Sequence, residues 1–440
     1  MNSPTPLCEN LKDTFMVIRI NPRRIITVLM TAYLMNVFYF NMYETVQKVL
    51  LWFLVGVYLA LNARTVSEIL NKHFLRYFKK KMVLLLFLTW GILILLTPFL
   101  HGTRDFSYFG EYITIVTAAL YCLAICVRIY KTEGENDLAE KFMRIFVYAM
   151  VLYIFSSIVA IVFPPYRDFI INNVSMSDYA RIVIQDERYR TRIGFAGLSV
   201  FSSGIKCAFA NLFVLFFGFK NLRKKNRIGM KIWVLYLLTI LGEFLYSRTS
   251  LLLSIIFLIL FVVMVLTKLG RITKFIEFVL LIFFAASIVI LLIGQFEGDN
   301  ASLAWQLEVF TNMSNGRGFN ATSLNIMRRM AFVPDISTLL FGDGRYAGVN
   351  GGYYMSTDLG YMRSILYYGL IGFLFVVILI VATLKAILKI RKEPEYSMLA
   401  IMSFIAFVVF EIKGECMGVF YPVIFTLMCC TSYSNEESHI

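Results

Sequence analysis

The sequence predicts an all-α integral membrane protein with about twelve transmembrane helices and a large, partly helical extracytoplasmic loop between helices 9 and 10. Hydrophobic residues make up 59% of the chain and charged residues only 16%, which is far from the balance of a soluble domain. Apolar runs of about 20 residues, the length that spans a bilayer as a helix, recur along the chain between short polar breaks. Each run is expected to be a helix, because lipid offers no partner for an unpaired backbone group.

The expected spans are 25–43, 48–63, 82–100, 111–129, 145–163, 198–219, 232–247, 250–267, 275–294, 364–384, 397–412 and 417–433. The alternating strands of a membrane barrel are not seen in the pattern. The first apolar run leads to no small-residue cleavage site, so we expect no cleavable signal peptide.

The orientation follows from the Lys and Arg residues in alternate loops, because positively charged loops stay in the cytoplasm. One set of loops carries about 27 of the 42 basic residues, and it comprises 1–24, 64–81, 128–144, 220–231, 268–274 and 385–396. We therefore expect a cytoplasmic arm at 1–24, one membrane domain at 25–433 and a cytoplasmic tail at 434–440. The long loops 164–197 and 295–363 then lie outside. The excess of Lys and Arg in the cytoplasmic loops and the attraction to anionic lipids explain the net charge of +14, so no nucleic acid partner is expected.

Cysteine and histidine give no sign of a metal site. The seven Cys are scattered without disulfide or metal-ligand spacing. Both long outer loops lack His, which we take to exclude a His metal site or a His base there. We expect no cofactor and no metal.

Arginine is distributed unusually in the two long outer loops, which together hold ten Arg and no Lys. The guanidinium group grips phosphate or carboxylate in bidentate fashion, whereas the Lys ammonium is a strongly hydrated point charge. We therefore expect an anionic ligand at the outer surface. For most of these Arg residues taken singly, we expect the alternative, in which the Arg pairs with acidic residues of the loops or with lipid phosphates.

Three charged residues lie within or beside apolar runs. Lys206 lies about 12 Å below the start of the sixth span, where a charge needs a cavity or a counter-ion. Glu243 and Arg248 flank the tight reversal between the seventh and eighth spans, whose hydroxyl groups can cap the eighth helix. Either these two residues form an internal pair that fixes the reversal, or they face a shared polar cavity.

The second outer loop has 69 residues and is expected to be structured, with amphipathic helices that lie on the membrane and roof a cavity. Its tyrosines suit stacking on sugar faces, although Tyr is common at membrane interfaces in any case. They are Tyr346, Tyr353, Tyr354 and Tyr361. If the chain is helical from 357, Asp358 and Tyr361 share one face, whereas Arg363 points elsewhere, toward the membrane interface.

Four short motifs follow one another in the second half of the chain. They are "RIGFAGLS" entering a helix after an outer loop, "YSRTSLLLS" at a helical reversal, "NGRG" followed by "LLFGDG", and "DLGYMRSILYYGLIG" leading into a helix. Their order, over roughly residues 180 to 385, resembles that of the O-antigen ligase and polymerase superfamily of bacterial envelope enzymes. Ligases usually place a His shortly before the last motif, and none stands there in this sequence. The difference favours a Wzy-type repeat-unit polymerase.

The resemblance implies a glycosyltransferase of the bacterial cytoplasmic (inner) membrane that acts on undecaprenyl-pyrophosphate-linked glycans at the outer face. It would polymerise oligosaccharide repeat units into O-antigen or capsular polysaccharide, by moving the growing glycan from its lipid pyrophosphate to a sugar hydroxyl of the next lipid-linked unit. The implied partners are these lipid-linked donors and acceptors, membrane lipids and, as an open point, a chain-length regulator. The alternatives are an O-antigen ligase-like glycosyltransferase and a flippase or other transporter, although no two-half repeat supports a transporter.

The implied reaction needs positive charge for the leaving phosphate and help in removing a proton from the acceptor hydroxyl. The candidates for the first task are Arg192, Arg248 and Arg317, with Arg345 and Arg363 as weaker ones. Asp358 is the candidate base, with Asp343 or Glu243 as substitutes, and a mechanism without a strong base stays open. Tyr361 and Lys206 complete the candidate binding residues.

Overall fold

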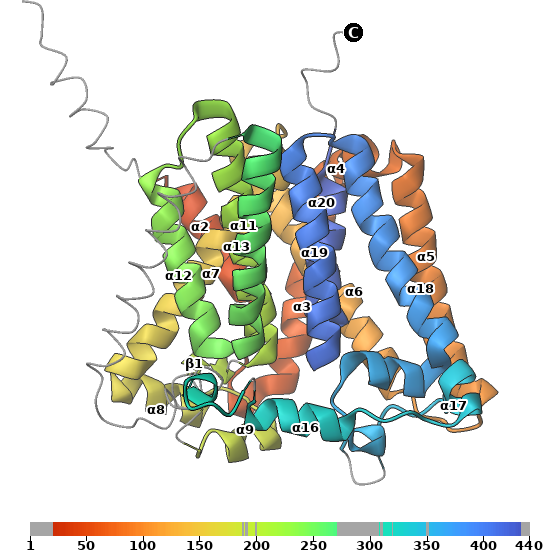
Figure 1. The fold of residues 1–440 in the computed structure, drawn as a ribbon. Coiled ribbons are helices and arrows are strands. Elements are labelled where there is room, and N and C mark those ends of the chain that lie inside the picture. Colours follow the sequence, from red (N-terminus) through yellow and green to blue (C-terminus); the bar gives the residue numbers. More distant parts are fainter. Residues whose placement is uncertain are drawn as a thin grey trace, which may run out of the picture.

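The computed structural model describes residues 21–186, 189, 192–198, 200–270, 308, 311–318, 320–348 and 352–432 of the 440-residue chain (Figure 1). Its first helices are α2 (Pro22–Met35), η1 (Asn41–Tyr43), α3 (Glu44–Leu61), α4 (Ala63–Ile69), the π-helical turn η2 (Leu70–Leu75), α5 (Phe78–Leu100), α6 (Ser107–Glu133) and α7 (Leu138–Val162). Then follow α8 (Pro164–Asn173), α9 (Asp178–Val183), β1 (Ile193–Gly194), β2 (Gly197–Leu198), α11 (Phe201–Lys225), α12 (Met230–Tyr246) and α13 (Arg248–Leu269). The last elements are α16 (Thr322–Met330), α17 (Ile336–Phe341), η3 (Tyr354–Ser356), α18 (Gly360–Ile390), α19 (Pro394–Lys413) and α20 (Met417–Cys430).

Eight helices of the described chain are long and apolar enough to cross a membrane, namely η1 with α3, α5, α6, α7, α11, α13, α18 and α19. Eleven of the twelve expected spans coincide with a helix, whereas the span 275–294 lies outside the described residues. The predicted helical membrane fold is thus confirmed. The count of twelve crossings stays a prediction.

Both long loops expected on the outside lie at the same end of the helix bundle. Figure 1 shows α8, α9, α16 and α17 together at the bottom, and α4 at the top with the turn between α11 and α12. We call the end that carries α8, α9, α16 and α17 the loop end. Its placement outside the cell remains a prediction from the Lys and Arg residues.

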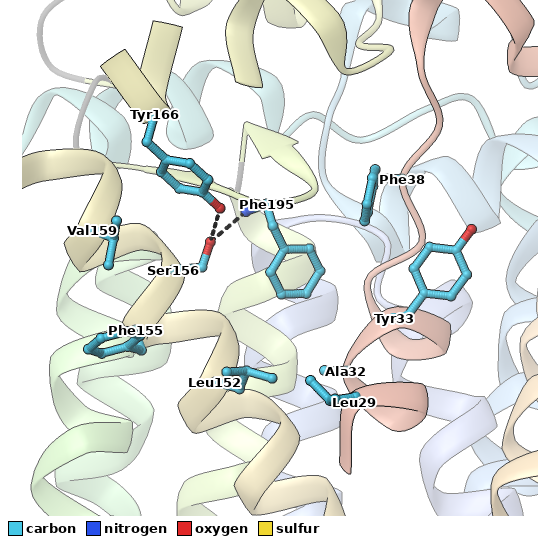
Figure 2. A pocket seen from close by; sticks show the side chains of 10 residues that line it. All are labelled: Leu29, Ala32, Tyr33, Phe38, Leu152, Phe155, Ser156, Val159, Tyr166 and Phe195. Carbon is cyan, nitrogen blue, oxygen red and sulfur yellow. Dashed lines mark hydrogen bonds between the residues drawn. The ribbon is translucent and has the colours of Figure 1, made fainter. Parts of the chain in front are cut away.

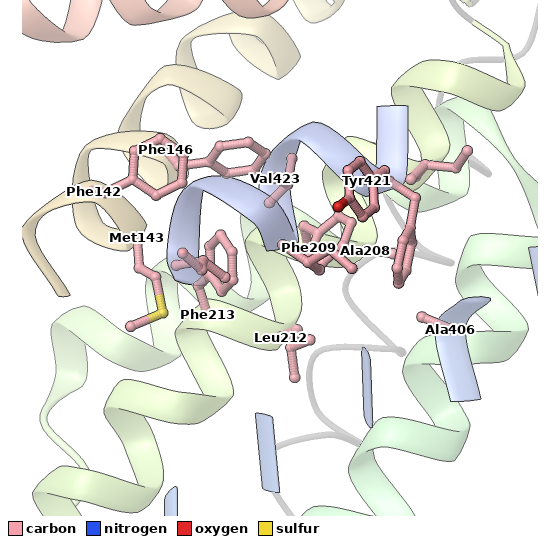
Figure 3. Close-up of a cluster of buried hydrophobic side chains, with 14 of the residues drawn as sticks. Phe142, Met143, Phe146, Ala208, Phe209, Leu212, Phe213, Ala406, Tyr421 and Val423 are labelled. Atoms are coloured by element: carbon pink, nitrogen blue, oxygen red, sulfur yellow. The ribbon is translucent and has the colours of Figure 1, made fainter. Parts of the chain in front are cut away.

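The core of the bundle is built around α11, which packs against α7, α12, α13, α19 and α20. Figure 3 shows the aromatic and aliphatic side chains that α7, α11 and α20 bring together there. The rings of Phe146 and Phe213 meet edge to face, with centroids 5.4 Å apart. Close packing of such side chains contributes to the association of helices in a membrane, where lipid tails provide no hydrophobic driving force between them.

The first expected span, 25–43, is wrong in its second half. Helix α2 ends at Met35, where the backbone N–H of Asn36 donates to the carbonyls of Ala32 and Tyr33 at 3.2 and 3.1 Å. The ammonium of Lys206 closes this end by donating to the Met35 carbonyl at 2.6 Å and to Asn36 Oδ1 at 3.1 Å. A cation at a helix C-terminus is stabilised by the negative end of the helix dipole. Lys206 thus has its partner in the backbone of α2.

A small β-hairpin, β1–β2, stands where a helix was expected to begin at 198. Gly197 has φ +86°, a conformation that other residues rarely adopt, and it closes the turn. A β-carbon at Gly194 would lie 2.9 Å from Ser157 Oγ of α7. The glycines of the "RIGFAGLS" motif therefore serve a turn and a close approach to a neighbouring helix.

Helix α18 is broken at Tyr368 and Gly369, and the break is filled by the "LLFGDG" segment of the long loop. The N–H groups of Asp343 and Gly344 donate to the carbonyls of Leu366 and Tyr367 at 2.7 and 3.0 Å. A β-carbon at Gly369 would collide with the Leu340 carbonyl of this segment. Backbone groups freed by the break are therefore paired, as a membrane protein requires.

We predict that Gly369→Ala lowers the thermal stability of the purified protein. Gly369 has φ +75°, so an alanine is strained by about 1–3 kcal/mol before the collision with Leu340 is added. Thermal unfolding in detergent, followed by size-exclusion chromatography, measures the change. Gly418→Ala is the control, because no atom lies within 4 Å of a β-carbon there. Equal melting temperatures for the two variants would contradict the docking of the loop on α18.

Candidate active site at the loop end

Arg248 begins α13 and connects the bundle to the long loop. Ser247 is the N-cap of this helix and accepts a hydrogen bond from the Ser250 N–H, so the predicted cap is confirmed. Arg248 Nη1 lies 2.8 Å from Glu308 Oε2, and its Nη2 donates to Ser323 Oγ at 3.0 Å. Burial would raise the pKa of Glu308, but hydrogen bonds from Thr322 and Arg248 hold this pKa below its usual value.

Arg192 is buried beside Arg248, with 2% of its surface exposed. Its guanidinium lies 4.9 Å from the centre of the Tyr189 ring. Burial lowers the pKa of Arg192 to about 10, Tyr189 opposes this change, and the charge of Arg248 adds to it. Two guanidinium groups from different segments therefore lie close enough to interact, and Glu308 compensates the charge of one of them, Arg248.

Asp358 lies just before α18, on a chain segment that packs against the turn between α19 and α20. We call residues 411–416 the α19–α20 turn. The segment at 357 is extended and the helix begins at Gly360, so the condition considered above, a helix from 357, is not met. Burial raises the pKa of Asp358 above its usual value, while the charges of Lys413 and Arg363 oppose the rise. A carboxylate with a raised pKa binds a proton more readily than an exposed one, which is the property required of a general base.

Arg363 is enclosed in protein and does not lie free at the interface as expected. It is 7% exposed, and its guanidinium lies 4.1 Å from the Tyr346 ring centre and 3.8 Å from that of Tyr353. Glu415 compensates its charge at 3.3 Å and also accepts a hydrogen bond from the Tyr346 hydroxyl. Arg363 is thus saturated by stacking and by an ion pair, which gives it a structural role.

Tyr346 is fixed to the short connection between α5 and α6. Its N–H and that of Ala347 donate to Asp105 Oδ2 at 2.7 and 2.9 Å. Burial would raise the pKa of Asp105, but these two hydrogen bonds, with those from Ser107, hold it below its usual value. The Tyr346 ring also stacks on Tyr108 at 4.7 Å, so its faces serve protein contacts and not the sugar stacking considered above.

Four other candidates show no interaction with Arg192 or Arg248 among the contacts of the described residues. Arg317 and Arg345 are exposed, and Arg345 lies 5.9 Å from the Tyr354 ring centre. Asp343 accepts hydrogen bonds from the hydroxyls of Thr338 and Tyr354 at 2.6 and 3.1 Å. Tyr361 packs against a small apolar cluster at the start of α18.

Glu243 is fully buried in the bundle and accepts a hydrogen bond from the Ser254 hydroxyl. Arg248 takes Glu308 and Ser323 as partners, so these two residues do not form the internal pair considered above. Within the described chain, no cluster of three or more His, Cys, Asp or Glu side chains has the arrangement of a metal site.

Sequence reasoning missed four residues of this region. Lys413 and Glu415 lie in the α19–α20 turn, which we expected only to connect two helices. Glu308 lies in the long loop, and no sequence motif marks it. His101 packs against Gly344, since a β-carbon there would lie 2.8 Å from His101 Cβ. The loop end therefore does contain a His, which the search of the two long loops overlooked. The charges in "EIKGEC" were the available signal for the turn.

An apolar groove of about 340 Å³ lies between α2, α7, α8 and the β-hairpin (Figure 2). Its wall includes Leu29, Phe38 and Phe155, and Ser156 Oγ accepts a hydrogen bond from the Phe195 N–H at 2.8 Å. None of the charged candidate residues lines it. The groove suits contact with hydrocarbon and is separate from the charged region.

We predict that removing the Glu415 carboxylate alone lowers the thermal stability more than removing both charges of the Arg363–Glu415 ion pair. Breaking a buried pair leaves an uncompensated charge, which costs about 3–5 kcal/mol. Thermal unfolding of Glu415→Gln, Arg363→Met and the double variant should show the double variant to be more stable than Glu415→Gln. Arg64→Met is the control, because its side chain is 94% exposed and its pair with Glu68 should contribute little. Additive losses in the double variant would contradict the buried pair.

Comparisons with protein-family models, with curated proteins and with solved structures find no match for this chain.

Proposed function

We propose that the chain polymerises lipid-pyrophosphate-linked oligosaccharide repeat units on the outer face of the bacterial cytoplasmic membrane. The observation that carries this proposal is a chain of neighbouring charges at the loop end, in which Arg192 feels the charge of Arg248, and Lys413 feels those of Arg248 and Asp358. Three cations, of which Arg248 also pairs with Glu308, and one carboxylate without an ion pair among the described side chains would combine an anion site with a candidate base. The membrane fold and the order of the four motifs support the same assignment.

In the proposed reaction, the acceptor hydroxyl attacks the anomeric carbon of the donor glycan. A new glycosidic C–O bond forms, the C–O bond to the lipid pyrophosphate breaks, and the hydroxyl proton passes to Asp358. The negative charge that develops on the departing pyrophosphate would be stabilised by Arg192 and Arg248. Because Arg192 is buried, its attraction to phosphate is screened less than that of an exposed Arg.

One observation favours a second candidate, a ligase-like glycosyltransferase of the same superfamily. The sequence argument against a ligase rested on the missing His before the last motif. His101 comes from the end of α5 instead and packs against Gly344. An imidazole at the loop end could serve as a base for transfer to a different acceptor.

Deletion of the gene separates these functions, with the surface polysaccharide analysed on a gel. Loss of a polymerase should leave single repeat units attached to the final acceptor. Loss of a ligase should leave no attached repeat units, and loss of a flippase should trap the units inside the cell. Long chains of normal distribution in the deletion strain would refute the proposed function.

We predict that Arg192→Lys and Arg248→Lys each reduce chain formation at least tenfold at unchanged protein level. The ammonium group keeps the charge but loses the bidentate geometry that suits phosphate. The ratio of polymerised to single-unit glycan on the gel measures the effect in the complemented deletion strain. Arg64→Lys, at an exposed position of α4, is the matched control. Full chain formation in both site variants would contradict the phosphate assignment.

A further inference from the structure

The ammonium group of Lys413 has no acidic partner in direct contact among the described side chains of the candidate site. It is the last residue of α19 and is partly buried. Its ammonium feels the charges of Asp358 and Arg248, and it forms no ion pair or hydrogen bond with any other side chain in the described chain. A partly buried charge without a contact partner is costly, so its retention calls for a reason.

The position of Lys413 relative to Asp358 is fixed by backbone packing. A β-carbon at Gly360, the first residue of α18, would lie 2.5 Å from Glu411 Oε2 and 2.6 Å from the Gly414 carbonyl. A β-carbon at Gly414 would lie 3.5 Å from the Asp358 carbonyl. The segment with Asp358 and the α19–α20 turn are therefore in direct contact on both sides of Lys413.

The charged groups that face Asp358 come from three elements. They are Lys413 from α19, Arg363 from α18 and the Tyr353 hydroxyl from the segment before η3. Arg363 is already compensated by Glu415. Lys413 is thus the cation whose charge is left for Asp358. The Asp358 carboxylate, for its part, makes no ion pair or hydrogen bond with a described side chain.

We propose that Lys413 is a positioning residue for Asp358, which keeps this carboxylate ionised without occupying its oxygen atoms. An ammonium in direct contact would occupy the oxygen lone pairs with which the carboxylate accepts a proton. An ammonium that is near but not in contact leaves these lone pairs free for a substrate hydroxyl. The group that these oxygens would take is a hydroxyl of the acceptor sugar. That last step rests on the proposed function, but the relation between the two charges does not.

Carbodiimide labelling tests the relation without a glycan substrate, because dicyclohexylcarbodiimide reacts with protonated carboxyl groups in membrane proteins. The full-length protein is labelled in detergent between about pH 4 and pH 9, and the Asp358 peptide is quantified by mass spectrometry. Removing Lys413 takes away a favourable charge, so the pKa of Asp358 should rise. We expect the labelling midpoint of Lys413→Gln to lie about 1 pH unit or more above that of the wild type.

Lys413→Arg keeps the charge and should keep the wild-type midpoint. Lys389→Gln, at an exposed position in the last turn of α18, is the matched control and should also leave it unchanged. Lys413→Met repeats the measurement if size-exclusion chromatography shows that Lys413→Gln is misfolded. An unchanged midpoint in the variant without the charge overturns the proposal.

Chain formation from the lipid-linked glycan of the deletion strain then links the relation to function. In Lys413→Gln the acid limb of the pH profile should move upward in parallel with the labelling midpoint, and activity should recover at higher pH. A shifted midpoint with an unshifted acid limb supports the charge relation and overturns Asp358 as the base. The two failures are therefore distinguishable.

Discussion

A helix that breaks inside a membrane protein must find new partners for the carbonyl groups that the break sets free. In α18 these carbonyls belong to Leu366 and Tyr367, and the N–H groups of Asp343 and Gly344 supply the partners. The two segments approach so closely because Gly342 and Gly369 carry no side chain. This backbone docking fixes the second half of the long loop on the bundle, and the arrangement of the charged residues depends on it.

The docking of the loop on α18 positions the charged side chains through a series of contacts. The docked segment continues to Tyr346, which Asp105 holds through its backbone N–H. Tyr346 and Tyr353 then enclose Arg363, whose position at the start of α18 brings Glu415 into contact. Because Glu415 lies in the α19–α20 turn, the same contacts bring Lys413 near Asp358. A break in one helix thus helps to determine that Arg363 is neutralised and that Lys413 is left near Asp358.

Apolar run length was enough to place eleven helices, because the need to satisfy backbone groups in lipid leaves few alternatives. It was not enough to find the early end of α2, which depends on Asn36 and on a Lys from another helix, or the break in α18, which depends on a loop far away in sequence. The site was predicted in part: Arg192, Arg248 and Asp358 stood out by residue type beside apolar runs. Lys413, Glu415 and His101 did not, because short connections between helices carry no periodic signal, and their neighbours are set by tertiary packing.

The arginines of the outer loops looked like one class in the sequence, and the structure divides them by what compensates each charge. Arg363 is neutralised by Glu415 and by two rings, and Arg167 pairs with Asp168 at 3.4 Å, as the loop-acid alternative held. Arg317 and Arg345 are exposed, where water screens their charge. Arg192 differs from these because it is almost fully buried and feels the charge of a second guanidinium, that of Arg248. Water screens the charge of a buried Arg less than that of an exposed one, and for this reason we place the proposed anion in this part of the loop end and not in the arginine-rich loops as a whole.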